Sequence, residues 1–221
     1  MSANSIFAFD VYGTLFNIKS VDTTCEKYFP GRGESIGQLW RQKQIQYSFL
    51  RQAMGKYVPF SSVTRDALRF SLAAYHLEWT ADTEQTLMEA YNHLSLYEES
   101  LYVLQKLKDQ SATLIVFSNG SRDMLEPLLE QAGLNDYLDH VISVDDIKQF
   151  KPSPASYQLI LEAVGAPRHE VTFLSSNGWD ISGAKAFGFT TAWINRSEQP
   201  IEELQLPPDY QYTTLTPLTQ E

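Results

Sequence analysis

The chain of 221 residues is long enough for one α/β domain with a smaller insertion, and its 43% hydrophobic and 13% aromatic content is typical of a globular protein. A formal net charge of −10 disfavours binding to nucleic acid or anionic membranes, and no apolar run reaches the roughly 20 residues of a membrane span. Cys25 is the only cysteine, which excludes an internal disulfide and a zinc site built on cysteine pairs.

Five short apolar segments predict buried strands of a parallel sheet, because strands covered on both faces are apolar throughout. They are Ile6–Phe9, Thr113–Phe117, His140–Val144, Val171–Leu174 and Thr191–Ile194. Helical patterns lie between them at Leu101–Lys108, Asp123–Gln131, Ala155–Val164 and Ile181–Phe187, and the last three end near a glycine. This alternation predicts a doubly wound, Rossmann-like α/β core.

The segment from residue 17 to residue 96 has helical periodicity without a competing strand pattern. Helices are expected at Glu34–Met54, Ser61–Tyr75 and Asp82–Asn92. We therefore expect residues 17–96 to form an inserted all-helical cap domain over the carboxyl ends of the strands, where such sheets bind ligands. Residues 1–16 and 97–221 would form the α/β core domain, with the tail from Gln199 packed on its surface.

Asp10 directly follows the first predicted strand, in the run Phe-Asp-Val-Tyr-Gly-Thr-Leu-Phe at residues 9–16. A carboxylate at a strand tip is a candidate nucleophile, although an Asp here could also stabilise the turn through nearby backbone N–H groups. Thr14 could orient Asp10 with its hydroxyl or simply stabilise the turn. The residues alone leave both alternatives open.

Polar residues also follow the second predicted strand and precede a later helix. Ser118 and Asn119 open a helix, whose start is either an ordinary cap or an anion site made by exposed N–H groups. Lys151 precedes a helix that contains Tyr157. Taken alone, Lys151 would be a surface cation and Tyr157 a core residue.

The fourth predicted strand is followed by Ser175, Asn177 and Asp180. Asp180 is the only acid in this segment, and one carboxylate beside Asp10 supplies too few hard oxygen ligands for magnesium. Arg41 lies on the first long predicted cap helix, where a charged residue would ordinarily face solvent.

Taken in order, these motifs resemble those of the L-2-haloacid dehalogenases of the haloacid dehalogenase superfamily. The matching segments are the first motif at Asp10, the serine motif at Ser118, Lys-Pro at Lys151, the Ser-x-Asn-x-Trp-Asp run at residues 175–180 and the cap helix around Arg41. Phosphatases of the superfamily carry a second Asp where this chain has Tyr12, because a leaving alkoxide needs a proton and a halide does not. Carbon–halogen cleavage is favoured over phosphate-ester hydrolysis.

The resemblance implies that Asp10 attacks C2 of a short L-2-haloalkanoic acid, that halide leaves toward Arg41, and that water activated by Asp180 hydrolyses the Asp10 ester. The product is an inverted D-2-hydroxy acid. The implied catalytic residues are Asp10, Thr14, Arg41, Ser118, Lys151, Tyr157, Ser175, Asn177 and Asp180. The implied substrate-binding residues are Tyr12, Arg41, Ile45, Phe60, Ser118, Asn119 and Trp179.

The same resemblance implies no metal or other cofactor, and a homodimer. The amino terminus lacks the basic region of a signal peptide, so we expect a cytoplasmic protein. Two positions depart from the usual pattern, since Asn17 replaces a common Asp and Gly178 a common Ala. The alternatives are a small-molecule phosphatase of the same superfamily and a catalytically silent binding protein.

Overall fold

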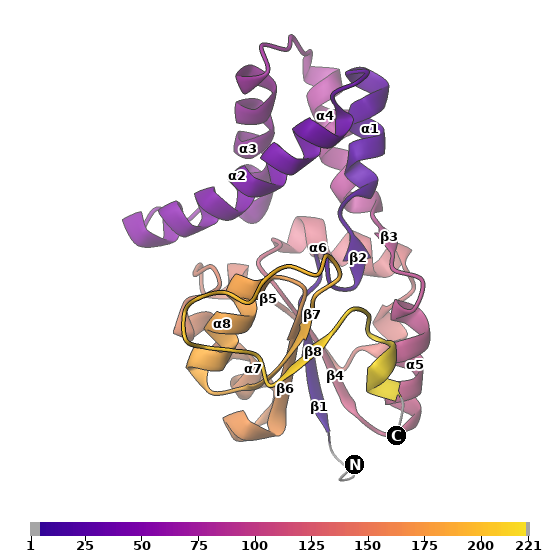
Figure 1. The fold of residues 1–221 in the computed structure, drawn as a ribbon, viewed down its shortest axis with the longest axis vertical. Coiled ribbons are helices and arrows are strands. Elements are labelled where there is room, and N and C mark those ends of the chain that lie inside the picture. Colours follow the sequence, from indigo (N-terminus) through magenta and orange to yellow (C-terminus); the bar gives the residue numbers. More distant parts are fainter. Residues whose placement is uncertain (1–4, 220–221) are drawn as a thin grey trace.

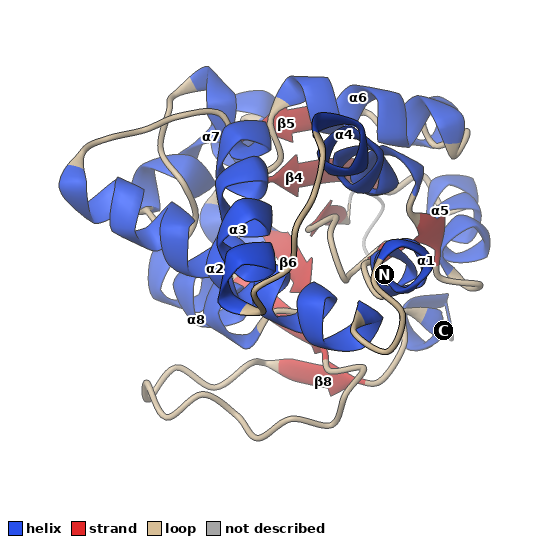
Figure 2. Cartoon of the chain, turned by 90° about the horizontal axis from the view of Figure 1, so that it is seen from above, coloured by secondary structure: helices blue, strands red, loops and turns tan. Residues whose placement is uncertain are grey.

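The computed structural model describes residues 5–219, and a six-stranded parallel sheet forms its centre (Figure 1). In the spatial order β5-β4-β1-β6-β7-β8, the strands are His140–Ser143, Thr113–Ser118, Ile6–Phe9, Val171–Ser175, Thr190–Ile194 and Tyr210–Tyr212. Helices α5 (Ser100–Asp109) and α6 (Arg122–Gln131) cover one face, and α7 (Pro154–Val164) and α8 (Gly178–Phe187) cover the other (Figure 2). The predicted doubly wound α/β class is confirmed.

Strand β1 lies at the centre of the sheet and is fully buried. Its last residue, Phe9, pairs with Val116 of β4 on one side and with Leu174 of β6 on the other. The chain order reverses across β1, because β4 and β5 extend the sheet to one side while β6 and β7 extend it to the other. Ligands of open α/β sheets bind beyond the carboxyl ends of the strands at such a switch point.

The edge strand β8 comes from the tail, which was expected only to pack over the core surface. Its side chains are exposed or half-buried, so its sequence contains no apolar run that would predict a strand. Asp209 fixes its start, since the carboxylate accepts a hydrogen bond from Thr191 N (2.9 Å) and pairs with Lys185 Nζ (2.6 Å). The tail therefore extends the sheet by one strand.

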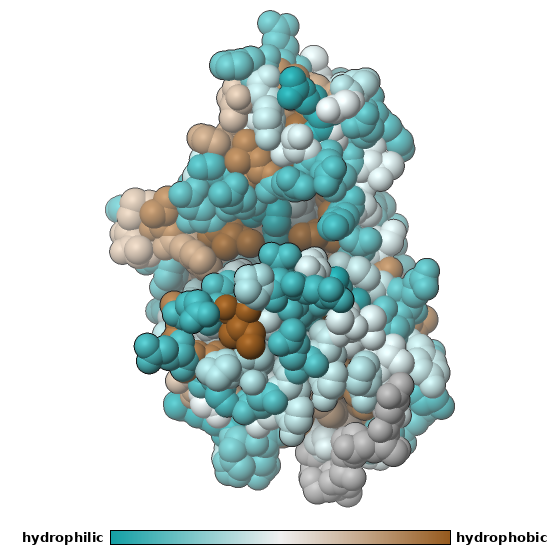
Figure 3. All heavy atoms as spheres, viewed as in Figure 1, coloured by the Kyte–Doolittle hydropathy of each residue, from teal (hydrophilic) through white to brown (hydrophobic). Residues whose placement is uncertain are grey.

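Four helices stand beyond the carboxyl edge of the sheet (Figure 1): α1 (Ser20–Tyr28), α2 (Gly33–Met54), α3 (Phe60–Ala74) and α4 (Ala81–Glu89). The last three begin within one residue of their predicted starts, and α4 continues as a 3₁₀ turn to His93. Figure 3 shows apolar side chains at the surface over the projecting end of α2. Among the described residues, no helix is long and apolar enough to cross a membrane.

The sequence did not predict α1 or the short ribbon at the base of the helical segment. Only Val21 and Cys25 are buried in α1, so its apolar stripe is too sparse to stand out. The ribbon consists of β2 (Phe16–Asn17) and β3 (Ser95–Leu96), which pair antiparallel. Strands of two residues are too short to show a periodic sequence pattern. The ribbon nevertheless pairs the segment by which the chain enters the helices with the segment by which it leaves them.

Glu84 is a buried acid that links α4 to α3. Its carboxylate accepts hydrogen bonds from Arg69 Nε (2.7 Å) and Nη2 (2.9 Å) and from Arg65 Nη1 (2.7 Å). Hydrogen bonding from Arg69 is the largest influence and holds the pKa of Glu84 at about 2, although burial opposes it. A buried carboxylate is tolerated here because it is paired and hydrogen-bonded.

We expect Glu84→Gln to lower the free energy of unfolding by about 1–3 kcal/mol at neutral pH, because the amide leaves two guanidinium groups without their anion. The pKa of Glu84 is depressed, so its stabilisation is present above its ordinary pKa of 4.5 and is lost as the pH falls toward 2. Urea unfolding should therefore show the deficit shrinking from about pH 5 to about pH 3. The control is Glu78→Gln, at an exposed position nearby. A deficit independent of pH would contradict this origin.

Candidate active site

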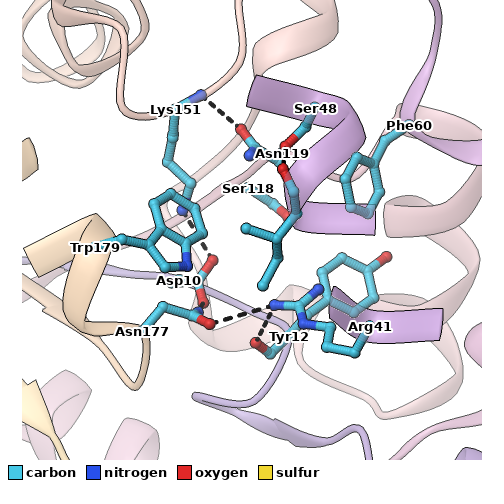
Figure 4. Close-up of a pocket in the computed structure, with 11 residues that line it drawn as sticks. Asp10, Tyr12, Arg41, Ser48, Phe60, Ser118, Asn119, Lys151, Asn177 and Trp179 are labelled. Atoms are coloured by element: carbon cyan, nitrogen blue, oxygen red, sulfur yellow. Dashed lines mark hydrogen bonds and ion pairs between the residues drawn. The ribbon is translucent and has the colours of Figure 1, made fainter. Parts of the chain in front are cut away.

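The carboxyl ends of the central strands bring together polar residues that are far apart in sequence (Figure 4). Asp10 follows β1, Ser118 ends β4 and Ser175 ends β6. Asp10 and Ser118 line an enclosed pocket of about 20 Å³, beneath α2 and the start of α3, and Ser175 lies next to Asp10. The pocket is lined by Asp10, Tyr12, Arg41, Ile45, Ser48, Phe60, Ser118, Asn119, Lys151, Asn177 and Trp179.

Asp10 is 5% exposed and its carboxylate is held by side chains from three segments. Oδ2 accepts hydrogen bonds from Thr14 Oγ1 (3.0 Å) and Asn177 Nδ2 (3.0 Å), with Ser175 Oγ at 3.5 Å, and Oδ1 accepts one from Lys151 Nζ (2.8 Å). Within residues 5–219, no backbone N–H of its own turn donates to this carboxylate. The geometry supports an oriented reactive group rather than a turn stabiliser.

The turn after Asp10 requires glycine at position 13. Three successive N–H groups, those of residues 14–16, converge on the carbonyl of Val11 at 3.0–3.2 Å. Gly13 has φ +91°, and a Cβ there would lie 2.9 Å from Ser176 Oγ. Ser176 N in turn donates to Thr14 Oγ1 (2.8 Å), so the turn and the loop after β6 fix each other.

Lys151 is the single cation between two buried carboxylates. Its Nζ lies 2.8 Å from Asp10 Oδ1 and 2.6 Å from Asp180 Oδ2, and the residue is 1% exposed. Burial by itself would lower the pKa of Lys151, but the charges of Asp10 and Asp180 outweigh it and the pKa is raised. Lys151 is therefore a firmly protonated ammonium.

Asp180 lies at the first turn of α8 and receives Tyr157 Oη at 2.7 Å. Burial raises the pKa of Asp180 and the charge of Asp10 adds to this, against the opposing effect of Lys151. Burial and then Asp180 raise the pKa of Tyr157 well above its ordinary value, so its hydroxyl stays a donor. Asp180 is thus a more basic carboxylate than usual, behind the pocket wall.

Helix α2 supplies Arg41, Ile45 and Ser48 to the pocket, at the i, i+4, i+7 spacing of one helical face. Sequence reasoning missed Ser48, which this spacing from Arg41 could have found. Arg41 Nη2 lies 3.4 Å from Asn177 Oδ1 and 3.5 Å from the Tyr12 carbonyl, both long contacts. Within the described chain Arg41 forms no ion pair.

Three buried donors at the pocket have no hydrogen-bond partner within residues 5–219: Tyr12 Oη, Arg41 Nε and Trp179 Nε1. The other indole N–H groups are all paired: Trp40 with Thr64 O, Trp79 with Glu84 and Trp193 with Ser176 O. Burial is the main cause that raises the pKa of Tyr12, so its hydroxyl keeps its proton. Unpaired buried donors are costly, which indicates a ligand rich in acceptors.

Ser118 and Asn119, at the end of β4, hydrogen-bond to neighbouring loop residues and do not cap α6. Ser118 Oγ accepts from Gly120 N (2.9 Å), and Asn119 Oδ1 accepts from Lys151 N (2.8 Å), which ties the Lys151 segment to the pocket. Gly120 is needed for close approach, because a Cβ there would lie 2.7 Å from the Tyr12 ring. All of the residues predicted from the sequence thus meet at or directly behind the pocket.

Among the described residues, no group of three or more His, Cys, Asp or Glu side chains is arranged to hold a metal ion. The ammonium of Lys151 lies between the carboxylates of Asp10 and Asp180. A divalent cation prefers several oxygen ligands, and this donor set does not fit it. Metal independence itself stays a prediction for experiment.

The site thus consists of a carboxylate at the tip of the central parallel strand, beneath the helices that lie between β1 and β4 in the chain. A model of the haloacid dehalogenase-like hydrolases matches residues 5–188. The (S)-2-haloacid dehalogenase of Pseudomonas sp. (strain YL) is 44% identical over 208 residues, which cover 94% of this chain and 90% of that protein. The (S)-2-haloacid dehalogenase of Xanthobacter autotrophicus is 46% identical over 191 residues, covering 86% and 75%.

Solved structures agree with the sequence matches. The L-2-haloacid dehalogenase from Xanthobacter autotrophicus with chloropropionic acid covalently bound has a TM-score of 0.93 at 39% identity, and the match covers 98% of this chain and 97% of that one. The chain belongs to the haloacid dehalogenase-like hydrolases and, within them, to the (S)-2-haloacid dehalogenase family.

Proposed function

We propose that this enzyme hydrolyses the carbon–halogen bond of short L-2-haloalkanoic acids to give halide and inverted D-2-hydroxy acids. The observation that carries this proposal is the Asp10 carboxylate, oriented by Thr14, Asn177 and Lys151 in a small closed pocket, with Tyr12 where a phosphatase needs a second acid. The relatives named above, and the chloropropionic acid bound covalently to one of them, support it.

In the first half-reaction an oxygen of Asp10 attacks C2 from the side opposite the halogen. The new C–O bond forms as the C–X bond breaks, and halide carries the bonding electrons away. Figure 4 shows the Arg41 guanidinium turned toward Asn177, which lies beside Asp10. The Arg41 guanidinium has no carboxylate partner among the described residues and can receive the anion.

In the second half-reaction water attacks the carbonyl carbon of the Asp10 ester. Asp180, whose pKa is raised by burial, takes the proton from that water, and Lys151 steadies the negative charge on the tetrahedral intermediate. Collapse of the intermediate breaks the bond between the Asp10 carbonyl carbon and the oxygen attached to C2, and the departing alkoxide takes the proton from Asp180. Asp10 returns to a carboxylate by releasing the second proton of the water. One oxygen of Asp10 thereby ends in the product.

The substrate carboxylate is assigned to the tip of β4, where Ser118 and Asn119 meet the hydroxyl end of Tyr12. A Cβ built at Gly120 would lie 3.0 Å from Tyr12 Oη and 3.2 Å from Ser118 Oγ, so these groups converge on one side of the pocket. Ile45, Phe60 and the Trp179 ring form the apolar wall around the substrate carbons.

The helices of residues 17–96 act as a cap domain on the core of residues 1–16 and 97–221. Support for this division comes from α2, which lies beyond the sheet and yet supplies Arg41, Ile45 and Ser48 to the pocket.

The homodimer also stays a prediction. Leu50, Met54 and Phe70 of α2 and α3 are 47%, 61% and 41% exposed and offer an apolar surface, and sedimentation equilibrium decides it. The cytoplasmic location stays an expectation from the sequence, and fractionation of the source cells decides it.

A phosphatase is the alternative function, and one assay separates the two. We expect the enzyme, dialysed against EDTA, to release chloride from L-2-chloropropionate at the rate of untreated enzyme, because Lys151 already pairs with both carboxylates. A generic phosphate ester with magnesium should not be hydrolysed. Restoration of activity specifically by magnesium would support the phosphatase function. Inactivity on both substrates would support a catalytically silent binding protein.

We expect Asp10→Asn to abolish halide release without unfolding the protein, since the amide is nearly isosteric but not nucleophilic. Wild-type enzyme cycled in ¹⁸O-water should carry label in Asp10, and a single turnover should give product with unlabelled oxygen. Mass spectrometry of the Asp10 peptide and of the product measures both, and also excludes deamidation of the variant. Label found directly in single-turnover product would mean that water attacks C2.

Arg41→Lys should lower kcat by at least about 10²-fold for L-2-chloropropionate, because a flexible point charge does not reproduce the guanidinium fork at a developing anion. The melting temperature should change little, since Arg41 makes only two long contacts. Arg51→Lys, on the same helix in an ion pair with Asp66, is the control for a charge-conserving change outside the pocket. Equal activity of the two variants would mean that Arg41 is a surface charge with no part in the reaction.

A further inference from the structure

The reaction pocket is too small and too enclosed for substrate to enter without movement of its wall. Its volume of about 20 Å³ is room for roughly one water molecule. Asp10, Ser118 and Lys151 are each at most 5% exposed. A halocarboxylate can reach Asp10 only if lining side chains move, and the structure indicates which ones.

A second, larger cavity of about 550 Å³ lies between α1 and α2. The side chains that line it include Lys19, Val21, Gln38, Arg41, Ile45 and Tyr91. Arg41 and Ile45 line both this outer cavity and the reaction pocket. These two side chains of α2 are therefore the partition between the two spaces.

The outer cavity changes character from its rim to its floor. Lys19, Gln38 and Gln199 at the rim are exposed to solvent. Val21 and Tyr91 at the floor are 1% and 2% exposed, and Ile45 continues this apolar surface to the partition. The cavity is thus open to water at one end, and at the other it is bounded by apolar side chains together with Arg41.

We propose that this outer cavity binds the alkyl chain of 2-haloalkanoates longer than chloropropionate. The proposal rests on the dehalogenase function. Arg41 and Ile45 move aside so that the chain extends from the reaction pocket into the outer cavity. Arg41 is suited to this, since its only hydrogen bonds within the described chain are the long contacts to Tyr12 and Asn177.

The test is a chain-length series with a variant that narrows only the outer cavity. Gln38→Phe places a ring at the rim, and Gln46→Phe, exposed on α2 outside both cavities, is the matched control. Wild type should release chloride from chloroacetate, L-2-chlorobutyrate and L-2-chlorohexanoate. Gln38→Phe should lower kcat/KM for chlorohexanoate about tenfold and leave chloroacetate within about twofold, because the added ring takes space from the chain alone.

The outcomes separate this inference from the function on which it rests. Wild type inactive on chloroacetate would overturn the dehalogenase function itself. Activity on chloroacetate with none on chlorohexanoate, or equal losses in Gln38→Phe and Gln46→Phe, would overturn the outer cavity as a chain site and leave the function intact.

Discussion

The active site depends on one buried ammonium group, that of Lys151. Lys151 contacts Asp10 at 2.8 Å and Asp180 at 2.6 Å, so a cation from the segment before α7 joins the tip of β1 to the first turn of α8. Leaving either carboxylate buried without that cation would cost several kcal/mol. The arrangement persists because Thr14, Asn177 and Tyr157 supply the remaining hydrogen bonds.

The same centre also depends on how the helical segment is anchored to the sheet. Arg196, in the loop after β7, donates to the Thr14 carbonyl (2.8 Å), pairs with Glu99 (2.7 Å) and stacks 3.5 Å over the Tyr97 ring. Thr14 precedes β2, and Tyr97 and Glu99 follow β3. The Arg196 guanidinium therefore contacts both segments that connect the sheet to the helices. It also fixes the position of Thr14, which orients Asp10.

Much of this architecture could be predicted because it rests on strong local patterns. The apolar strands, the helices that end at glycine and the motifs around Asp10, Lys151 and Asp180 all lie where the sequence placed them. What the sequence did not reveal depends on tertiary contacts. The strand β8 has exposed side chains, and the ribbon β2–β3 has two residues in each strand.

The site shows the same limit at the level of single residues. Ser48 carries no chemical signature in sequence and acquires a place in the pocket only because α2 turns that face toward Asp10. Arg196 lies outside every motif, and its three contacts come from segments that folding brings together. Spacing on a helix could have identified Ser48, whereas no local pattern could have identified Arg196.

The charge balance around Lys151 has a consequence for the protein at work. Asp10 and Asp180 supply two negative charges, and Lys151 and Arg41 supply two positive ones. When Asp10 becomes an ester it loses its charge, but the carboxylate of the bound acid brings one negative charge into the same pocket. Once halide has left, the ester therefore has the same total charge in the pocket as the free enzyme. The negative charge has moved from the strand tip to the substrate, and the pocket holds the intermediate without an added counter-ion.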